Sequence, residues 1–325
     1  MKTVLGADIG GTKCMVCVGT VDGGGKISII DKFRFDTDSD NPEASMARIE
    51  TELARLLEAS GAPQPAAIGV SVGGYIDTRE GVIVSTPVIP LLKNYPICAK
   101  LSARFGVPAF AQNDANACAL AEWLYGAGRG SVNMVFLTAG TGLGSGLILD
   151  GKLYVGSAFN AGEVGHIRLS PIGPVGCGKA GSFEGLCSGA GMAQYARMRA
   201  LEALQGGRAF AFAPNLKAVE ALNAKTVSQA ANAGDADAIA IFDEVGANFG
   251  RGLAVIVDIL NPDTIVIGSV FQRDEKLLRP SMERALFAEA QAVSARSVKI
   301  VPAKLGDDIG LYAAFAAAMN GLNEK

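Results

Sequence analysis

One arrangement of strands and glycine turns occurs twice in this chain of 325 residues. Near the N-terminus, an apolar strand pattern at residues 3–7 leads through a glycine turn to a second strand pattern at residues 14–18, and a hairpin pattern follows at residues 22–25. The same order of strand, glycine loop, strand and turn returns within residues 133–153. Such a repeat indicates two halves that share one duplicated plan.

The remaining pattern alternates between strands and helices. In the second copy, strands are expected at residues 134–137 and 146–149, with a turn at Asp150 and Gly151. The other expected elements are a helix at 42–60, strands at 67–72 and near 107–111, and then a helix at 238–260, a strand at 264–268 and a helix at 310–319. Alternating strands and helices indicate an α/β fold.

Length and charge narrow the class of protein. A chain of 325 residues is long for one hydrophobic core, so we expect two lobes with a ligand-binding cleft between them. No apolar stretch approaches the roughly twenty residues that a membrane span needs. A net charge of -3 without clusters of Lys or Arg argues against nucleic acid as a partner.

The cysteines and the N-terminus indicate a cytoplasmic protein. The six cysteines lack the spacing of a disulfide scaffold, which suits reduced thiols. Cys14 and Cys17 form a CxxC-like sequence, but it continues a strand pattern and is interpreted as buried strand rather than as a redox pair. A strand and a glycine turn begin by residue 4, so the N-terminus does not resemble a signal peptide.

The first glycine turn has the character of a phosphate-binding loop. Its sequence is DIGGTK, and glycines let the backbone bend tightly and offer N–H groups to an anion. A carboxylate at this place is compatible with phosphate only if Mg²⁺ lies between them. The residues expected to bind ATP in this loop are Asp8, Gly10, Gly11, Thr12 and Lys13. The alternative is a plain hairpin turn with a capping aspartate.

The second copy carries a matching loop, TAGTGLGSG at residues 138–146. Its expected ATP ligands are Gly140, Thr141 and Gly142. Two rival nucleotide motifs fail. A dinucleotide fingerprint counted from Gly140 would need glycine at Ser145, and the P-loop-like start at residues 173–180 has Ala180 where a magnesium-binding Ser or Thr is required.

Together these motifs resemble the ROK family of sugar kinases and repressors. The resemblance runs through DIGGTK, GVSVGGYID at residues 69–77, QNDANACALAEW at 112–123, TAGTGLGSG, AGEVGHI at 161–167, LNPDTIVIGS at 260–269 and LGDDIGLYAAF at 305–315. It implies an α/β, two-lobed, actin-like ATPase (ribonuclease H-like) fold with a duplicated core and an interlobe cleft. The implied lobes are residues 1–117 with 304–325, and residues 118–303.

Asn113 and Asp114 follow an apolar strand and precede a helix-like run. Taken singly, either is more often a helix N-cap than a catalyst. Their position at a strand end between two phosphate loops favours a functional role, since a phosphoryl acceptor must lie there. The resemblance implies that Asp114 is the general base and that both residues contact the sugar.

The family pattern also assigns further ligands by position. It places sugar contacts at Glu163, at His166 (the only histidine) and at Glu184, and adds Gly74 and Thr86 from the first lobe. It places Gly268 at the ATP site. The implied cofactors are ATP and Mg²⁺.

A structural zinc site of the family is expected to be lost here. Relatives commonly carry CGCGxxGCxE, whose three cysteines bind zinc together with the histidine. In the aligned stretch at 175–184, Val175 and Ser182 replace two cysteines, so only His166 and Cys177 remain as ligands. Two ligands do not make a structural zinc site, and Glu184 is retained.

Several alternatives stay open. Glucose is the first choice of substrate, but GGYIDTREGVIVST at residues 73–86 is similar to the loop of N-acetylmannosamine kinases, and fructose, mannose and allose remain candidates. A phosphoryl donor other than ATP also stays open. A catalytically silent sugar sensor is a further alternative. A repressor is disfavoured because only seven residues precede Asp8, and the GEVGH loop argues against a mechanochemical ATPase. ROK enzymes are often dimers, so the resemblance allows a homodimer.

Overall fold

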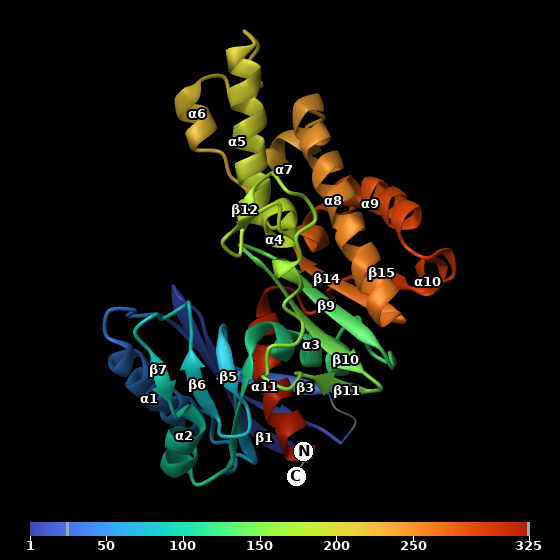
Figure 1. Ribbon diagram of the computed structural model, residues 1–325. Coiled ribbons are helices and arrows are strands. Elements are labelled where there is room, and N and C mark those ends of the chain that lie inside the picture. Colours follow the sequence, from blue (N-terminus) through green and yellow to red (C-terminus); the bar gives the residue numbers. More distant parts are fainter. Residues whose placement is uncertain (24–25, 324–325) are drawn as a thin grey trace. The chain divides into compact units, whose positions relative to one another are not determined.

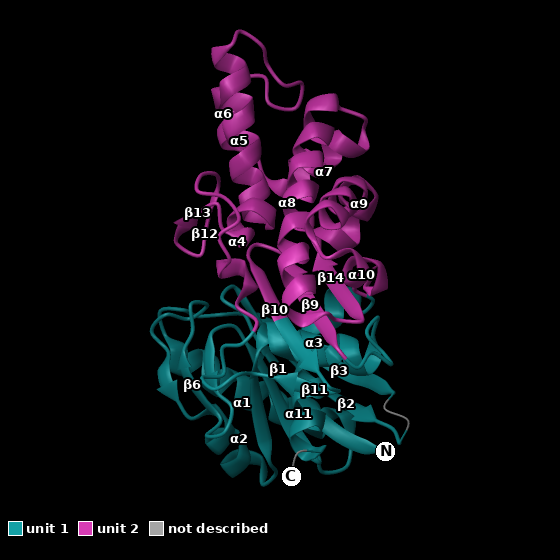
Figure 2. Cartoon of the chain, turned by 45° about the vertical axis from the view of Figure 1, so that its right-hand side comes forward, with its two compact units in different colours: residues 1–132, 146–161, 304–325 teal, residues 133–145, 162–303 magenta. Residues whose placement is uncertain are grey.

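The computed structural model describes residues 1–23 and 26–323, which form two compact units (Figure 1). Unit 1 contains residues 1–132, 146–161 and 304–325, and unit 2 contains residues 133–145 and 162–303 (Figure 2). Part of the hairpin expected at residues 22–25 lies outside the described residues. None of the helices among the described residues is long and apolar enough to cross a membrane.

Unit 1 is built on a five-stranded mixed sheet with the order β3-β2-β1-β4-β8. Its strands are β1 (Lys2–Ile9), β2 (Lys13–Val21), β3 (Ile27–Asp36), β4 (Ala67–Val72) and β8 (Ala109–Asn113). The first three strands pair antiparallel, whereas β4 is parallel to both β1 and β8. The carboxyl ends of β1, β4 and β8 therefore meet at one edge of the sheet.

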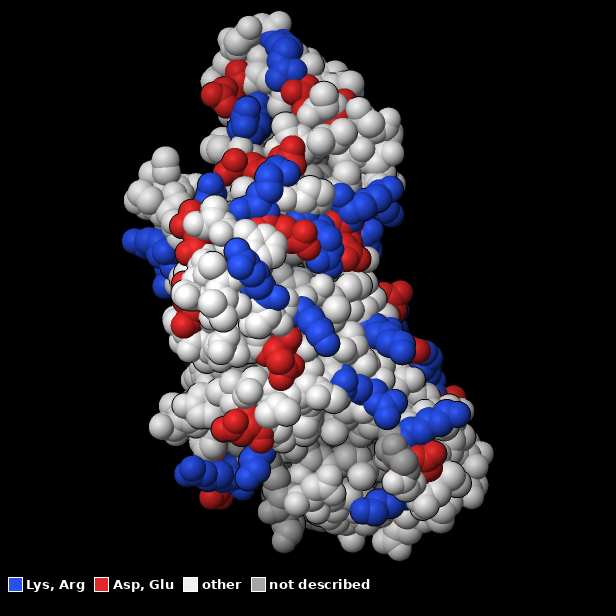
Figure 3. Space-filling view, turned by 90° about the vertical axis from the view of Figure 1, so that its right-hand side faces the viewer, with Lys and Arg blue, Asp and Glu red and all other residues white. Residues whose placement is uncertain are grey.

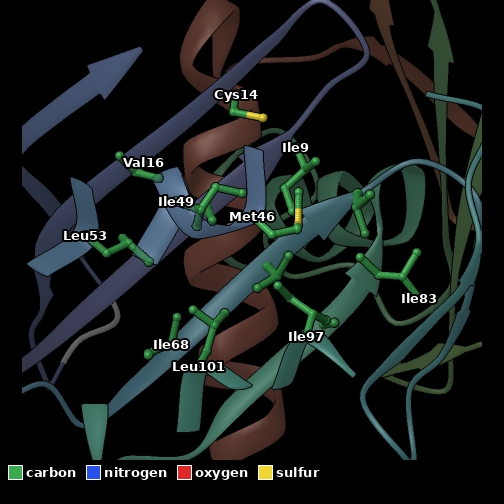
Figure 4. Packing of buried hydrophobic residues seen from close by; sticks show 14 of the residues in the cluster. Ile9, Cys14, Val16, Met46, Ile49, Leu53, Ile68, Ile83, Ile97 and Leu101 are labelled. Carbon is green, nitrogen blue, oxygen red and sulfur yellow. The ribbon is translucent and has the colours of Figure 1, made fainter. Parts of the chain in front are cut away.

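Helices cover both faces of this sheet. One face packs against α1 (Pro42–Ser60) and α2 (Ile97–Phe105), in the apolar cluster drawn in Figure 4. The other packs against α11 (Ile309–Asn323) and α3 (Asp114–Tyr125). Cys14 belongs to the first cluster and Cys17 to the second, so the CMVC sequence points its two thiols to opposite faces of β2.

Helix α1 shows how the local sequence determines an element. Asn41 caps its N-terminus by accepting a hydrogen bond from the Ala44 N–H group, and Pro42 occupies the first turn, where no N–H donor is needed. From Met46 on, its buried residues recur every three or four positions, at Ile49, Leu53 and Leu56, and Ser45 is buried beside Met46. The helix ends at Gly61, whose φ of 59° is left-handed. The expected helix at 42–60 is confirmed.

The second sheet repeats the topology of the first. Its order is β11-β10-β9-β14-β15. The strands are β9 (Met134–Ala139), β10 (Leu143–Leu149), β11 (Lys152–Tyr154), β14 (Thr264–Ser269) and β15 (Lys299–Pro302). β14 is parallel to β9 and to β15, and β11 is antiparallel to β10. Asp150 and Gly151 both have positive φ in the turn between β10 and β11, as expected there. The duplicated plan is confirmed.

The remaining elements decorate the two sheets. Unit 1 adds a small sheet of β5 (Tyr75–Asp77), β6 (Val82–Ser85) and β7 (Lys93–Tyr95), and a 3₁₀ turn, Gly306–Asp308. Unit 2 adds the 3₁₀ turn Val164–His166, the strands β12 (Val175–Gly176) and β13 (Lys179–Ala180), and the helices α4 (Phe183–Cys187), α5 (Gly189–Gln205), α6 (Leu216–Glu220), α7 (Ala224–Asn232), α8 (Ala236–Leu260), α9 (Val270–Glu289) and α10 (Ala292–Ser297). Basic and acidic side chains are interspersed on the face shown in Figure 3.

The compact units divide the chain differently from the lobes expected at residues 1–117 with 304–325 and 118–303. Residues 118–132 and 146–161 lie in unit 1. The reason for the first segment is that α3 packs along α11 and stays with the sheet that α11 covers. The second boundary falls within β10, after Ser145.

Candidate active site

Two carboxylates lie at the edge of the first sheet where its parallel strands end. Asp8 is near the end of β1, directly opposite Ser71 of β4. Asp114 follows β8 and begins α3. A Cβ atom built on Gly73, just after β4, would lie 3.3 Å from Oδ2 of Asp114. The topology of the sheet thus brings together residues that are about a hundred positions apart.

Asp8 is held in a confined place. Burial raises the pKa of its carboxyl to about 6, the neighbouring Ser71 hydroxyl lowers it, and the negative charge of Asp114 raises it. A Cβ atom on Gly310, at the start of α11, would overlap the carboxylate of Asp8, so only glycine leaves room for it. Two carboxylates close together in a desolvated place favour an added cation.

We expect Asp8→Asn to stabilise the protein at neutral pH when Mg²⁺ and nucleotide are absent. The folded protein holds the Asp8 proton up to about pH 6, whereas the unfolded chain releases it near 3.8. Stability contributed by the protonated form is therefore lost as the pH rises from about 4 to 6. One pKa unit is about 1.4 kcal/mol, which limits the loss to about 3 kcal/mol.

Thermal unfolding across this pH range measures the effect. The melting temperature of Asp8→Asn should exceed that of the wild type at pH 7.5, and the two should converge near pH 4. An Asn variant less stable than the wild type at pH 7.5 would contradict the assignment of Asp8 as a destabilising buried charge.

Asp114 is accessible to solvent, yet many protein atoms surround its carboxylate. That desolvation raises the pKa of Asp114 above its usual value, while the N–H group of Ala115 lowers it. Oδ1 accepts the hydrogen bond from this N–H group at 2.9 Å. A carboxyl with a raised pKa at a solvent-accessible position is suited to accept a proton.

Asn113 and Thr86 fix the loop after β4. The Asn113 side chain caps α3 by accepting hydrogen bonds from the N–H groups of Ala115 and Asn116, which is the N-cap role considered as an alternative. Its Nδ2 also donates to the Gly74 carbonyl at 3.1 Å. Thr86 is buried, and its hydroxyl donates to the carbonyl of Gly73. Both predicted sugar ligands therefore have partners inside unit 1 and hold the backbone that leads to Gly74.

The first glycine loop is a well-held turn between β1 and β2. The Gly10 N–H group donates to the Lys13 carbonyl at 3.1 Å, and the Thr37 hydroxyl donates to the Gly10 carbonyl at 2.7 Å. Gly11 accepts from the hydroxyl of Ser39, while the side chains of Thr12 and Lys13 are exposed. The loop is thus both the hairpin turn of the alternative interpretation and a candidate for phosphate contact.

The second glycine loop opens onto a pocket of about 640 Å³ in unit 2. Helices α5, α7 and α9 all begin at this pocket, so their N-terminal N–H groups and dipoles favour an anionic ligand there. The lining residues are Gly140, Thr141, Gly189, Ala190, Ala193, Gln194, Arg197, Asn223, Ala224, Lys225, Ser269, Val270 and Arg273. They include three cations, and the described lining contains no Asp or Glu.

Sequence reasoning missed most of this pocket. It found Gly140 and Thr141. At the end of β14 it named Gly268, which is buried, whereas the next residue, Ser269, lines the pocket. The Asn223 cap before α7 was a readable signal of a helix start. Nothing local indicated that several helix starts would converge on one pocket.

Glu163 and His166 lie in the 3₁₀ turn region of unit 2. Both side chains are more than half exposed, and Nε2 of His166 is 3.8 Å from Oε2 of Glu163. Glu184 behaves differently, because its two carboxylate oxygens accept hydrogen bonds from the N–H groups of Leu143 and Cys177. Three of the predicted sugar ligands therefore belong to unit 2, but only Glu184 is tied into the backbone.

The stretch that the family pattern assigns to zinc has a different donor set here. Ser182 donates to the Gly176 carbonyl at 2.8 Å and caps α4. Burial and the carboxylate of Glu184 raise the pKa of Cys177 to about 12, which disfavours the thiolate that zinc requires. The described residues contain no group of three or more His, Cys, Asp or Glu side chains arranged for a metal. These donors do not fit a structural zinc ion.

The two sheets of equal topology and the paired glycine loops define an actin-like ATPase fold. The chain belongs to the ROK family, which matches residues 4–320. It is 31% identical to the glucokinase of Streptomyces coelicolor over 318 residues, which cover 97% of this chain and 96% of that protein. The structure is similar to that of a ROK family glucokinase from Streptomyces griseus in complex with glucose and AMPPNP, with a TM-score of 0.76, 31% identity and coverage of 98% and 100%.

The family similarity includes regulators as well. The chain is 30% identical to the DNA-binding transcriptional dual regulator NagC of Escherichia coli over 260 residues. These residues cover 79% of this chain and 62% of NagC. The glucokinase match spans nearly the whole of both proteins, whereas the NagC match leaves a large part of NagC uncovered.

Proposed function

We propose that this protein transfers the γ-phosphoryl group of ATP to the 6-hydroxyl of a hexose, with glucose as the first candidate and Asp114 as the general base. The protein is an ATP-dependent sugar kinase of the glucokinase type. The observation that carries the residue assignment is the accessible carboxylate of Asp114 at the N-terminus of α3, with a raised pKa. Phosphoryl transfer needs such a base to accept the hydroxyl proton during attack.

The nucleotide pocket in unit 2 supports the donor assignment. Its three helix N-termini and the backbone of Gly140 and Thr141 suit a polyphosphate chain. The proposed ATP ligands in unit 1 belong to the first glycine loop and are Asp8, Gly10, Gly11, Thr12 and Lys13. Asp8 would hold Mg²⁺, which when bound neutralises phosphate charge.

We expect the sugar to be bound by two kinds of groups: exposed polar side chains, and backbone that other polar side chains hold in place. Glu163 and His166 are exposed and unconstrained enough to meet hydroxyl groups. Asn113 and Thr86 act on the sugar through the backbone that they fix at Gly73 and Gly74. Asn113 and Thr86 can therefore shape the sugar site although their side chains are hydrogen-bonded within the protein.

A coupled assay of hexoses with MgATP tests the substrate. Glucose should give the highest kcat/KM, and N-acetylmannosamine is the nearest competitor, followed by mannose, fructose and allose. A clear preference for N-acetylmannosamine would replace glucose as the assignment. Binding of a hexose without ADP formation from any of them would instead indicate a silent sugar sensor.

We expect the protein to be active without zinc. Val175 and Ser182 cannot supply thiolates, and structural zinc normally needs four ligands. Metal analysis of protein purified without added metals should find far less than one zinc ion per chain. A chelator should abolish activity only by removing magnesium, so excess Mg²⁺ alone should restore it. Stoichiometric zinc bound through His166 and Cys177 would contradict this account.

A further inference from the structure

The side chain of Glu184 links two functional loops of unit 2. Its Oε2 accepts a hydrogen bond from the Leu143 N–H group at 2.9 Å, and Leu143 lies within the second glycine loop. Its Oε1 accepts from the Cys177 N–H group at 2.8 Å, in the loop that follows His166. Hydrogen bonds to an ionised acceptor are roughly twice as strong as neutral ones.

Gly142 leaves room for this carboxylate, and Gly176 leaves room for the part of the side chain that carries it. A Cβ atom on Gly142 would lie 2.6 Å from Oε2 of Glu184, and a Cβ atom on Gly176 would lie 2.9 Å from its Cγ. A larger residue at either glycine would therefore collide with the side chain of Glu184.

A second tie joins the same loop to the nucleotide pocket. Gln194, which lines that pocket, accepts from the Val175 N–H group at 3.0 Å and donates to the Val175 carbonyl at 2.9 Å. The loop from Pro174 to Glu184 is thus fastened to α5 and to the glycine loop by hydrogen bonds in place of thiolate ligands. A change in the conformation of this loop would therefore change the shape of the nucleotide pocket, and the reverse also holds.

We infer that Glu184 is a positioning residue for the nucleotide, because it fixes the glycine loop at Leu143 whether or not a sugar is bound. This inference rests on the proposed function, and it adds a role to the sugar contact expected for the same residue. Each carboxylate oxygen has two lone pairs, so the backbone hydrogen bonds leave acceptor capacity for a sugar hydroxyl. The two roles are separable, since only the positioning role affects nucleotide binding without sugar.

The test is the affinity of the sugar-free protein for Mg-AMPPNP, measured by calorimetry. Glu184→Gln keeps the size of the side chain, but its NH₂ group cannot accept from one of the two N–H donors. We expect nucleotide affinity to fall at least tenfold, which corresponds to about 1.4 kcal/mol. Glu163→Gln is the matched control, because it removes a carboxylate that is exposed and pairs only loosely with His166. Its sugar-free nucleotide affinity should stay within about twofold of the wild type.

A second variant guards against a simple loss of folding. Glu184→Asp keeps the charge, but its side chain is one methylene shorter and cannot reach the N–H groups of both Leu143 and Cys177, so it should cause a similar loss of nucleotide affinity. Suppose that the wild type binds Mg-AMPPNP and that the folded Glu184→Gln variant binds it equally well. This result would overturn the inference and leave the proposed function standing. A wild type that does not bind the nucleotide would overturn both.

Discussion

Asp114→Asn is expected to lower kcat by about 10²- to 10⁴-fold, the usual contribution of a general base. The asparagine still accepts a hydrogen bond from the N–H group of Ala115, so α3 and the Gly73 loop should keep their structure. The affinities for glucose and for Mg-AMPPNP should change little. Retention of more than about a tenth of the wild-type kcat would remove Asp114 as the general base.

Asn113→Ala provides a comparison for this variant. It removes the helix cap and the hydrogen bond to the Gly74 carbonyl but leaves the carboxylate in place. Its main effect should be a higher KM for sugar and a stability loss of about 1 kcal/mol, typical of a lost N-cap. A loss of kcat as large as that of Asp114→Asn would show that the two residues act as one unit.

Glu122→Ala is expected to cause the largest loss of stability of any single change considered. The side chain is fully buried in unit 1. Its carboxylate accepts hydrogen bonds from the N–H groups of Lys304 and Leu305 at 2.9 and 2.8 Å, and from that of Ala127 at 2.7 Å. Each unsatisfied donor costs about 1–3 kcal/mol, so the variant should lose roughly 3 kcal/mol or more.

Denaturant unfolding measures this loss, with Glu43→Ala as the matched control. Glu43 is largely exposed and its carboxylate is 3.8 Å from the Lys100 ammonium group, a surface pair that contributes about 0–1 kcal/mol. A Glu122→Ala variant as stable as the control would show that the backbone around residues 304–305 can reach other partners. The buried carboxylate would then be dispensable for unit 1.

Much of the fold could be predicted from the sequence because the signals are local. The helix at 42–60 has its cap, its proline and its apolar period within one stretch of chain, and the strand at 67–72 is confirmed as β4. The helix expected at 238–260 is confirmed as α8, with its left-handed end at Asn261. The duplicated topology was visible because each copy carries its own glycine turn.

The site was predictable only in part, because its remaining features depend on contacts between distant residues. Gly310 lies against the carboxylate of Asp8, and these two residues come from opposite ends of the chain. No local sequence pattern predicts such a contact. The same is true of the pocket that we propose for the nucleotide, where helices begin at Gly189, Ala224 and Val270. The sequence showed that two zinc ligands were missing, but not that hydrogen bonds donated by Ser182 and accepted by Glu184 and Gln194 hold the loop instead.

The structure also changes how the nucleotide loop should be tested. Gly142→Val is an obvious variant from the sequence alone, intended to weaken nucleotide binding more than sugar binding. Because any side chain at this position would meet Glu184, the variant would disturb a predicted sugar ligand as well. Arg273→Ala alters the pocket without touching that carboxylate and is the cleaner choice.

The proposed reaction is the phosphorylation of a hexose with ATP as the phosphoryl donor. The most direct measurement is ³¹P NMR of the purified protein with glucose, ATP and Mg²⁺, compared with Asp114→Asn under the same conditions. We expect a sugar 6-phosphate and ADP in equal amounts, with both products nearly absent for the variant. ADP formed without any sugar phosphate, or equal product from both proteins, would rule out the proposed function.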